Sequence, residues 1–429
     1  MNLIILLFVS FFALCLLGVP VGASLGLSAL ITGLRCGITP LSMVQQMYSM
    51  VNSYTLLAIP LFLLVGNIME YGQITERLVR FASTLVGHIR GGLGQVNVLA
   101  NLIMAGISGS ANADAAALGG MMIPAMEKEG YPADMAAAIN ACASTMGPII
   151  PPSMLMVVYG AYSGVSVGAM FLAGMVPGVF IALFMMVTIY YWAKKYPSIK
   201  KRDKMASFKE IWAAFKHAFL ALLVPVIIIV GVLGGAFTAT ESGMIASVYS
   251  LIVTIFVYKT VKFKDFVAIL KKSLRSMAGP MFCAAGAGAF GYMMAYLQIP
   301  KLVLELAGPI AGNRYLTLLF LFALFLILGC FMDAIPAIMI FLPIVQELQN
   351  AAGIDPLHMA ILVVVTLCYG FVTPPYGLTM LLSSSIAGVP STKVIRRTVP
   401  FYLSFLGVAV IMIFLPDVIL LLPRIFMGA

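Results

Sequence analysis

Charge is what this sequence has least of. Charged residues make up 9% of its 429 residues and hydrophobic residues 62%, whereas about a quarter of a soluble globular domain is charged. The shortage excludes a soluble globular protein. Uncharged runs at 2–34, 135–193 and 359–392 are each longer than the roughly 20 residues with which one helix crosses hydrocarbon. Each run therefore holds more than one pass or hairpin, and the composition predicts an all-α polytopic membrane protein.

The sequence also lacks the common motifs for binding metals and nucleotides. The six cysteines and three histidines are scattered along the chain, without the close spacings of metal or redox pairs. The phosphate-binding pattern Gly-x-x-x-x-Gly-Lys-Ser/Thr does not occur in the sequence. We therefore expect no metal held by cysteine or histidine, and no ATP bound to this chain.

The positive charge is concentrated in two segments. The formal net charge is +10; residues 194–216 carry eight Lys or Arg against two acids, and residues 259–275 carry six against one. Short loops rich in Lys and Arg stay on the cytoplasmic side of a membrane. Both segments are therefore predicted to be cytoplasmic loops beside membrane lipid, with two passes between them. This distribution does not favour the alternative, a nucleic-acid-binding protein.

Segments near the N-terminus leave the topology open. Residues 2–34 are interrupted by a helix-breaking cluster at 18–22, so they form either one long broken helix or two short ones. A further pass is expected at 48–69. At 73–90, charged residues mix with apolar residues at helical spacing, which predicts an amphipathic helix in the membrane interface or in a solvated loop.

One carboxylate is isolated from all other charge. Asp114 is the only charged residue between Gly91 and Met126, and an ionisable group at membrane depth is costly and marks a functional site by default. It lies in a segment, 109–150, whose two halves are each marginal for a full pass. A polar turn at 127–132 separates the halves, and three prolines at 148–152 follow them. We predict a re-entrant hairpin with non-helical backbone at its break.

The second half of the chain repeats this pattern. A displacement of 219 lays Asp114 on Asp333, and one of 223 lays Gly147 on Gly370. Asp333 is likewise the only charge in its apolar segment. Duplicated membrane segments with Gly or Pro interruptions are typical of secondary transporters. The predicted units are a first repeat at 1–193, a basic cytoplasmic loop at 194–216, and a second repeat at 217–429 with its own re-entrant hairpin at about 330–370.

Groups with oxygen atoms gather at both breaks, and they suit sodium, a hard cation that takes about six oxygen ligands. The candidate ligands of a first site are Ser108, Ser110, Asn112, Asp114 and backbone near Gly147; those of a second are Asp333, Gly370 and Thr373. The second set has fewer side-chain oxygens, so backbone carbonyls must contribute more there. The alternative is that the small residues allow close helix packing and Asp114 caps a half-helix.

Two further groups of polar residues have less certain roles. The residues assigned to a polar substrate cavity are Pro151, Ser153, Pro374, Ser383 and Ser384; packing is the alternative for the two serines that follow the second break. Glu241 is the only charge between Ala218 and Tyr258. We interpret it as a structural residue that hydrogen-bonds at a helix break, with ligand contact as the alternative.

Four motifs together resemble the large membrane subunit of the tripartite ATP-independent periplasmic (TRAP) transporters. They are Gly-Ser-Ala-Asn-Ala-Asp-Ala-Ala-Ala-Leu-Gly at 109–119, Pro-Pro-Ser at 151–153, the segment 333–343, and Gly-Phe-Val-Thr-Pro-Pro at 370–375. The likeness covers essentially the whole chain. One departure is Ala239, where the family pattern leads us to expect a proline before Thr-Glu.

The resemblance implies two inverted repeats, a scaffold, and an elevator-type transport domain that holds both hairpins. It also implies sodium-driven import of organic acids, such as sialic acid or C4-dicarboxylates, across the bacterial inner membrane. Two partners follow from it, a small four-helix membrane subunit and a periplasmic substrate-binding protein. A stand-alone sodium-coupled carboxylate transporter is the alternative from the same class. A passive channel and a membrane aspartyl enzyme are the alternatives from other classes.

Overall fold

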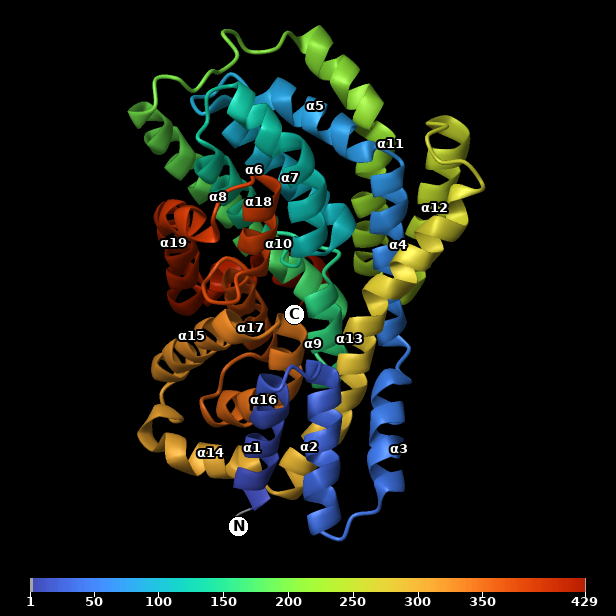
Figure 1. Ribbon diagram of the computed structural model, residues 1–429, viewed down its shortest axis with the longest axis vertical. Helices are drawn as coiled ribbons and strands as arrows, with labels where there is room; N and C mark the ends of the chain where they lie inside the picture. Colours follow the sequence, from blue (N-terminus) through green and yellow to red (C-terminus); the bar gives the residue numbers. More distant parts are fainter. Residues whose placement is uncertain (1–2, 429) are drawn as a thin grey trace.

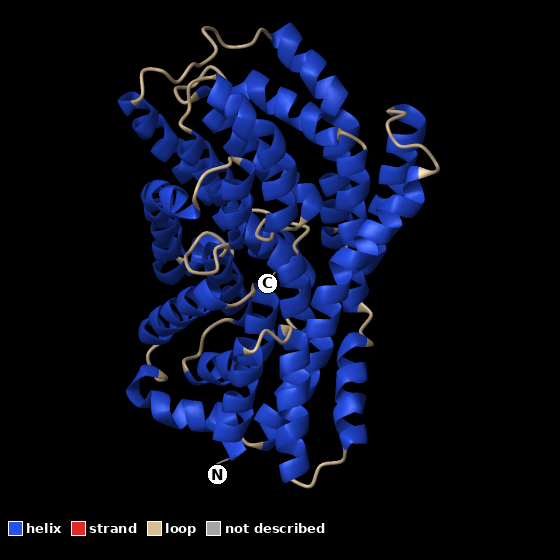
Figure 2. Cartoon of the chain, viewed as in Figure 1, coloured by secondary structure: helices blue, strands red, loops and turns tan. Residues whose placement is uncertain are grey.

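The computed structural model describes residues 3–428; in that range helices are joined by loops and turns, and there is no strand (Figure 2). Among these residues, six helices are long and apolar enough to cross a membrane, or eight if each of two bent pairs counts as one span. The expectation of an all-α polytopic protein is confirmed. The helices are α1 (Leu3–Leu16), α2 (Val21–Arg35), α3 (Pro40–Val51), α4 (Ala58–Tyr71), α5 (Ile74–Val86), α6 (Gly92–Ser108), α7 (Ala111–Lys128), α8 (Ala133–Ser144), α9 (Met154–Ser163), α10 (Val167–Trp192), α11 (Phe208–Leu233), α12 (Ala239–Ile252), α13 (Asp265–Tyr296), α14 (Ile299–Ala307), α15 (Arg314–Phe331), α16 (Ala334–Ala351), α17 (Pro356–Gly370), α18 (Leu378–Ile386), α19 (Ser391–Phe414), α20 (Pro416–Ile419) and α21 (Leu421–Met427).

The N-terminal segment forms two short helices, not one broken helix. Gly18 takes a left-handed φ of 82° after α1, and Pro20 precedes the first residue of α2. The two helices pack against each other, and α2 packs along α13 (Figure 1). The pass expected at 48–69 falls on a bent pair of helices: α3 ends at Val51, and the next helical stretch begins at Thr55 with a bend of 58°.

The amphipathic segment forms α5, which covers the upper end of the molecule in Figure 1. Its apolar face is buried at Ile74, Leu78 and Ala82, against α6 and α11. On its polar face, the Arg77 guanidinium lies 4.0 Å from the centroid of the Tyr258 ring. The helix is therefore attached to the protein along its length.

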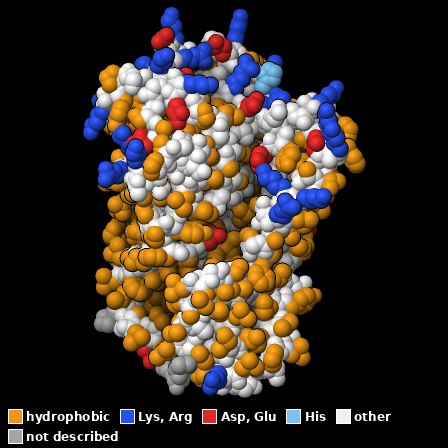
Figure 3. Space-filling view, viewed as in Figure 1, with side chains coloured by type: hydrophobic (Ala, Val, Ile, Leu, Met, Phe, Trp, Pro, Cys, Tyr) orange, Lys and Arg blue, Asp and Glu red, His pale blue; other side chains and the backbone are white. Residues whose placement is uncertain are grey.

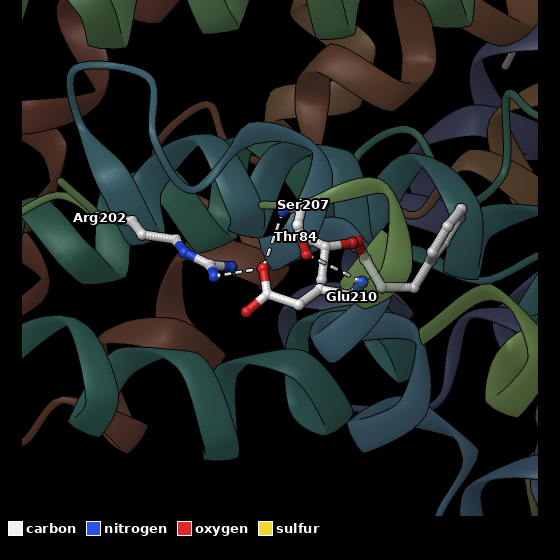
Figure 4. A network of polar contacts seen from close by, with 5 residues as sticks. Thr84, Arg202, Ser207 and Glu210 are labelled. Carbon is white, nitrogen blue, oxygen red and sulfur yellow. Dashed lines mark hydrogen bonds and ion pairs between the residues drawn. The ribbon is translucent and has the colours of Figure 1, made fainter. Parts of the chain in front are cut away.

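Both basic segments are shorter as loops than the sequence suggested. In the first, α11 already begins at Phe208, because Ser207 and Glu210 form a capping box, and Arg202 pairs with Glu210 at 2.8 Å (Figure 4). In the second, α13 begins at Asp265, so the basic residues that follow, including Lys272, lie on a 32-residue helix. Assigning all of 259–275 to a cytoplasmic loop is therefore a mistake that the structure corrects.

Lys and Arg side chains gather at the upper end of the molecule, above a broad apolar band (Figure 3). The first basic loop is fastened there to the turn between α7 and α8. The Lys200 amide donates to the Glu129 carbonyl at 2.9 Å, and the Ser198 hydroxyl donates to the Gly130 carbonyl at 3.1 Å. Helices α16 and α17 lie in the lower half of the same view (Figure 1). The positive-inside rule predicts that the upper end faces the cytoplasm.

The two halves contain similar series of helices, but with a different register from the one inferred from Asp114 and Asp333. Helices α7 and α16 are both 18 residues long, and their N-cap residues are Ser110 and Asp333. Their starts are thus displaced by 223, the same displacement that relates Gly147 to Gly370. Asp114 lies one helical turn inside α7. The helix boundaries therefore align Asp333 with Ser110, and not with Asp114 as the displacement of 219 had suggested.

Candidate functional site

A cavity of about 460 Å³ lies where the starts of α7 and α16 approach α4 and α13. Its lining includes Ser108, Ser110 and Asn112 from the first half and Asp333 from the second. The opposite wall comes from α4 and α13. The structure thus brings side chains from both predicted sites to one space.

The turn into α7 depends on one glycine. Gly109 has a left-handed φ of 62°, and a Cβ atom there would lie 2.5 Å from the Pro152 carbonyl oxygen. Glycine is the residue that tolerates both conditions. After it, the Ser110 hydroxyl accepts a hydrogen bond from the Ala113 amide at 3.5 Å and so caps α7. The helix start therefore lies directly against the proline break.

Asp114 is buried behind this helix start. Its side chain has no exposed surface, and it is absent from the cavity lining. The Ser108 hydroxyl approaches it, yet neither carboxylate oxygen has a partner at hydrogen-bond geometry among the described residues. The Asn112 Oδ1 atom is also buried without a partner. Unpartnered buried oxygens are costly, so this group of atoms suits a cation.

Gly147 brings the broken backbone onto the same group. A Cβ atom at this position would lie 2.8 Å from Asp114 Oδ2 and 2.8 Å from the Ser110 carbonyl carbon. The chain from 145 to 153 is non-helical. The non-helical break therefore lies directly against Asp114 and the start of α7.

The second helix start is more open. Asp333 is the N-cap of α16, and its Oδ1 accepts a hydrogen bond from the Ala334 amide at 2.7 Å. Its side chain lines the cavity and is partly exposed. One carboxylate oxygen thus has a backbone partner, and the group faces open space.

Glycine also permits the close packing beside Asp333. A Cβ atom on Gly370 would lie 2.5 Å from the backbone of Gly329, so α15 and α17 touch through their main chains. The Tyr376 amide donates to the Cys330 carbonyl at 2.9 Å, and the Thr373 hydroxyl donates to the Tyr369 carbonyl at 2.7 Å. This region offers mainly backbone oxygens to a ligand.

None of the five residues assigned to the substrate cavity lines the 460 Å³ space. Ser153 is buried, where its hydroxyl donates to the Pro148 carbonyl and accepts from the Met156 amide. Pro151 and Pro374 lie within the two breaks. Ser383 and Ser384 lie in α18: the Ser383 hydroxyl accepts from Asn140, and the Ser384 hydroxyl donates to the Leu381 carbonyl. Pro148 is the proline of the first break that reaches the cavity.

A buried network joins the first hairpin to α18 and to the second break. The Asn140 amide on α8 donates to the Ala115 carbonyl, next to Asp114, and to the Ser383 hydroxyl, both at 3.0 Å. One turn along α18, the Thr379 hydroxyl donates to the Phe371 carbonyl at 2.8 Å and to the α8 carbonyl next to Asn140 at 3.3 Å. Helix α18 from the second half is thus fastened to α8 from the first.

The far wall of the cavity holds residues that the sequence reasoning missed. Asn67 and Glu70 come from α4, and Lys272 and Ser276 come from α13. Lys272 had been counted with a cytoplasmic loop, and Glu70 lay beyond the end of the predicted pass. In the sequence, Glu70 and Lys272 were marked only as charged residues next to an apolar segment.

Glu241 has the structural role that was expected of it. It occupies the third position of α12, where its Oε2 accepts from the Thr238 amide at 2.8 Å and from the Thr238 hydroxyl at 2.9 Å. The Thr238 hydroxyl in turn accepts from the Glu241 amide and completes a capping box. The hydrogen bonding at a helix end that was expected of Glu241 is therefore present.

The chain matches the model of a known protein family over residues 8–418. The description of that family is "Tripartite ATP-independent periplasmic transporter, DctM component". The match spans both predicted hairpins and all the candidate ligands between Ser108 and Thr373.

Individual proteins agree with the family match. The sialic acid TRAP transporter large permease protein SiaM of Vibrio cholerae is 36% identical over 414 residues, which cover 96% of each chain. The C4-dicarboxylate TRAP transporter large permease protein DctM of Pseudomonas aeruginosa is 38% identical over 404 residues, 94% of each chain.

A solved structure shares the fold. The YdaH transporter of Alcanivorax borkumensis superposes with a TM-score of 0.65 at 16% identity, covering 94% of this chain and 96% of its own. At this identity the likeness concerns the arrangement of the helices alone.

Proposed function

Because the chain belongs to the tripartite ATP-independent periplasmic transporter family, as its DctM component, we propose that it is the large membrane subunit of a sodium-coupled importer of organic acids that depends on a binding protein. The family consists of secondary transporters, not enzymes, and is not driven by ATP. The protein is a multi-pass protein of the bacterial inner membrane.

The observation that carries the sodium proposal is the state of Asp114. A bound cation would compensate the charge of this buried carboxylate, which has no hydrogen-bond partner among the residues that the structure describes. A first sodium ion would use the oxygens of Ser108, Ser110, Asn112 and Asp114, with backbone near Gly147. Oxygen-only ligands without fixed geometry suit a hard monovalent cation.

A second sodium ion would bind between the end of α15 and the second break. Its ligands would be Asp333, Thr373 and backbone near Gly370. The close approach of Gly370 to Gly329 supports a site built mainly from carbonyls. Sodium entering down its gradient would supply the free energy for uptake.

Two features support the proposal of inverted repeats in an elevator-type transporter. The turn between α7 and α8 is fastened to the basic end of the molecule, whereas α16 and α17 lie in the opposite half (Figure 1). The buried contacts between α8 and α18 would let both hairpins move as one transport domain. Helices α4, α11, α12 and α13 would belong to the scaffold.

The names of the relatives guide the proposals on substrate and partners. The two curated relatives are named for sialic acid and for C4-dicarboxylates, so the substrate is proposed to be an organic acid of this kind. A periplasmic substrate-binding protein would deliver it, and a small four-helix membrane subunit would pack on the scaffold. The family match does not favour a stand-alone carboxylate transporter.

Proteoliposomes that contain the chain with its small subunit test this function. Uptake of labelled N-acetylneuraminate and succinate is measured with an imposed sodium gradient, with and without the binding protein. We expect uptake only when both sodium and the binding protein are present, and a loss of sodium dependence in Asp114→Ala or Asp333→Ala. Sodium dependence that is unchanged in both variants would overturn the two-site proposal. Uptake without the binding protein would favour the stand-alone alternative.

A further inference from the structure

The wall of the cavity opposite the hairpins carries one cation. Three charged residues line the 460 Å³ space: Glu70, Lys272 and Asp333. Lys272 Nζ lies 2.7 Å from Glu70 Oε1. Lys272 is the only positively charged residue among those that line this space.

The helices that carry this pair are held together independently of it. Asn67 Nδ2 on α4 donates to Ser273 Oγ on α13 at 2.9 Å, and both side chains are buried. Helices α4 and α13 also pack along each other. The position of Lys272 therefore does not depend on Glu70 alone.

The pair is loose enough to exchange partners. The Lys272 and Glu70 side chains are 40% and 38% exposed, and ion pairs with this degree of exposure contribute little to stability. The carboxylate of a ligand can therefore take the place of Glu70 beside the Lys272 ammonium group at little cost in free energy. Ser276 lies one helical turn beyond Lys272 and also lines the cavity, so a hydroxyl is available beside the ammonium group.

The position of Lys272 indicates which stage of transport it serves. It lies seven residues into α13, about 10 Å along the helix from its start at 1.5 Å per residue. That start follows directly on the second basic loop, which the positive-inside rule places in the cytoplasm. Asp333, at the start of α16, lines the same cavity from one of the hairpins that would hold the ions.

We propose that Lys272, with Ser276, receives the carboxylate of the substrate at the cytoplasmic end of the cavity, and that Glu70 is the resting partner which the acid displaces. When the acid leaves, Glu70 returns to the ammonium group, so the cavity never holds an unpaired lysine. This assignment rests on the proposed function, because it takes an organic acid as the substrate. It makes Lys272 a substrate-contacting residue on the scaffold, separate from both ion sites.

The test uses the reconstituted complex with its binding protein, and N-acetylneuraminate and succinate as probes. Lys272→Gln is expected to lower the initial rate of sodium-driven uptake at least tenfold, and Lys272→Arg to keep a third or more of it. Lys271→Gln is the matched control, because Lys271 is an exposed neighbour on the same helix and does not line the cavity. Its rate should equal that of the wild type.

A second measurement, thermal unfolding, distinguishes contact of Lys272 with the substrate from a purely structural role in joining α4 to α13. In sodium, the transported acid should raise the unfolding temperature of the purified complex. Lys272→Gln should abolish this rise, whereas Glu70→Gln should keep or enlarge it, because the ammonium group then has no competing carboxylate. A purely structural role would make the two variants behave alike. The double variant Glu70→Gln/Lys272→Gln leaves no unpaired charge, so it gives the same information if Lys272→Gln alone does not fold.

The outcomes are distinct. Normal uptake by Lys272→Gln, or an equal loss of acid-induced stabilisation in Glu70→Gln and Lys272→Gln, overturns the inference and leaves the proposed function intact. A wild type that imports neither acid in response to sodium overturns the proposed function, and the inference with it.

Discussion

The two hairpins meet at one cavity but use their carboxylates differently. Asp114 lies one turn inside α7, fully buried and without a hydrogen-bond partner in residues 3–428. Asp333 is the N-cap of α16, partly exposed to the cavity and bonded to the Ala334 amide. The two carboxylates thus differ in position by one helical turn. Asp114 is left for an ion to compensate, whereas one oxygen of Asp333 already accepts a hydrogen bond. The two proposed ion sites are related in architecture and unequal in chemistry.

The largest expected effect concerns the carboxylates themselves. Asp114→Asn keeps the volume of the side chain but leaves a buried ion without its charged ligand, which costs about 3 kcal/mol, or about a hundredfold in sodium affinity. Asp333→Asn should lower the sodium affinity about tenfold at most, because asparagine caps a helix as well as aspartate does and the start of α16 is kept. Sodium titrations of the unfolding temperature, with choline as the control, measure both. Equal losses would contradict the comparison.

The glycines beside each carboxylate should come next. A methyl group at Gly147 meets Asp114 Oδ2 and the start of α7, and one at Gly370 meets the backbone of Gly329. Such overpacking costs about 1–3 kcal/mol. Gly147→Ala should weaken the response to sodium, and Gly370→Ala should lower the unfolding temperature by separating α15 from α17. Gly120→Ala is the matched control because open space surrounds that position. A harmless Gly147→Ala would argue against the first site.

Smaller effects should come from the neutral ligands. Asn112→Ala and Thr373→Val each remove one polar group, which is worth about 1 kcal/mol, a change of a few-fold in half-saturating sodium. Changes at separate sites add within about 0.5 kcal/mol. The double variant should therefore show additive effects in the sodium dependence of uptake. A larger coupling would mean that both residues serve one site.

The smallest effect on transport is expected outside both hairpins. Glu241→Gln weakens the capping box at the start of α12, which should lower stability by about 1 kcal/mol. The rate of sodium-driven uptake per folded molecule should stay at the wild-type level. Thermal unfolding and uptake on the same preparation measure the two quantities. A loss of uptake larger than the loss of folded protein would assign Glu241 a role in transport.

Much of the site was predictable from the sequence because its signals are local. A lone carboxylate in an apolar run and prolines that remove backbone donors both point to a ligand site without knowledge of the fold. The register between the halves was less secure. A displacement of 219 matched Asp114 to Asp333, whereas the helix boundaries place Ser110 opposite Asp333.

The sequence by itself determined that this is a helical membrane protein in which two carboxylates, Asp114 and Asp333, are isolated in apolar segments interrupted by proline and glycine. Those properties depend on hydrophobic run length and on backbone chemistry within a few residues. Only the tertiary structure decided that Asp114 is sealed off while Asp333 faces a cavity, and that Lys272 lines its far wall. Glu70 and Lys272 are 202 residues apart in the chain, and no local pattern records a contact of that kind. Because α4 packs on α13, Lys272, which the sequence placed in a basic loop, lines the cavity and belongs to the proposed substrate path.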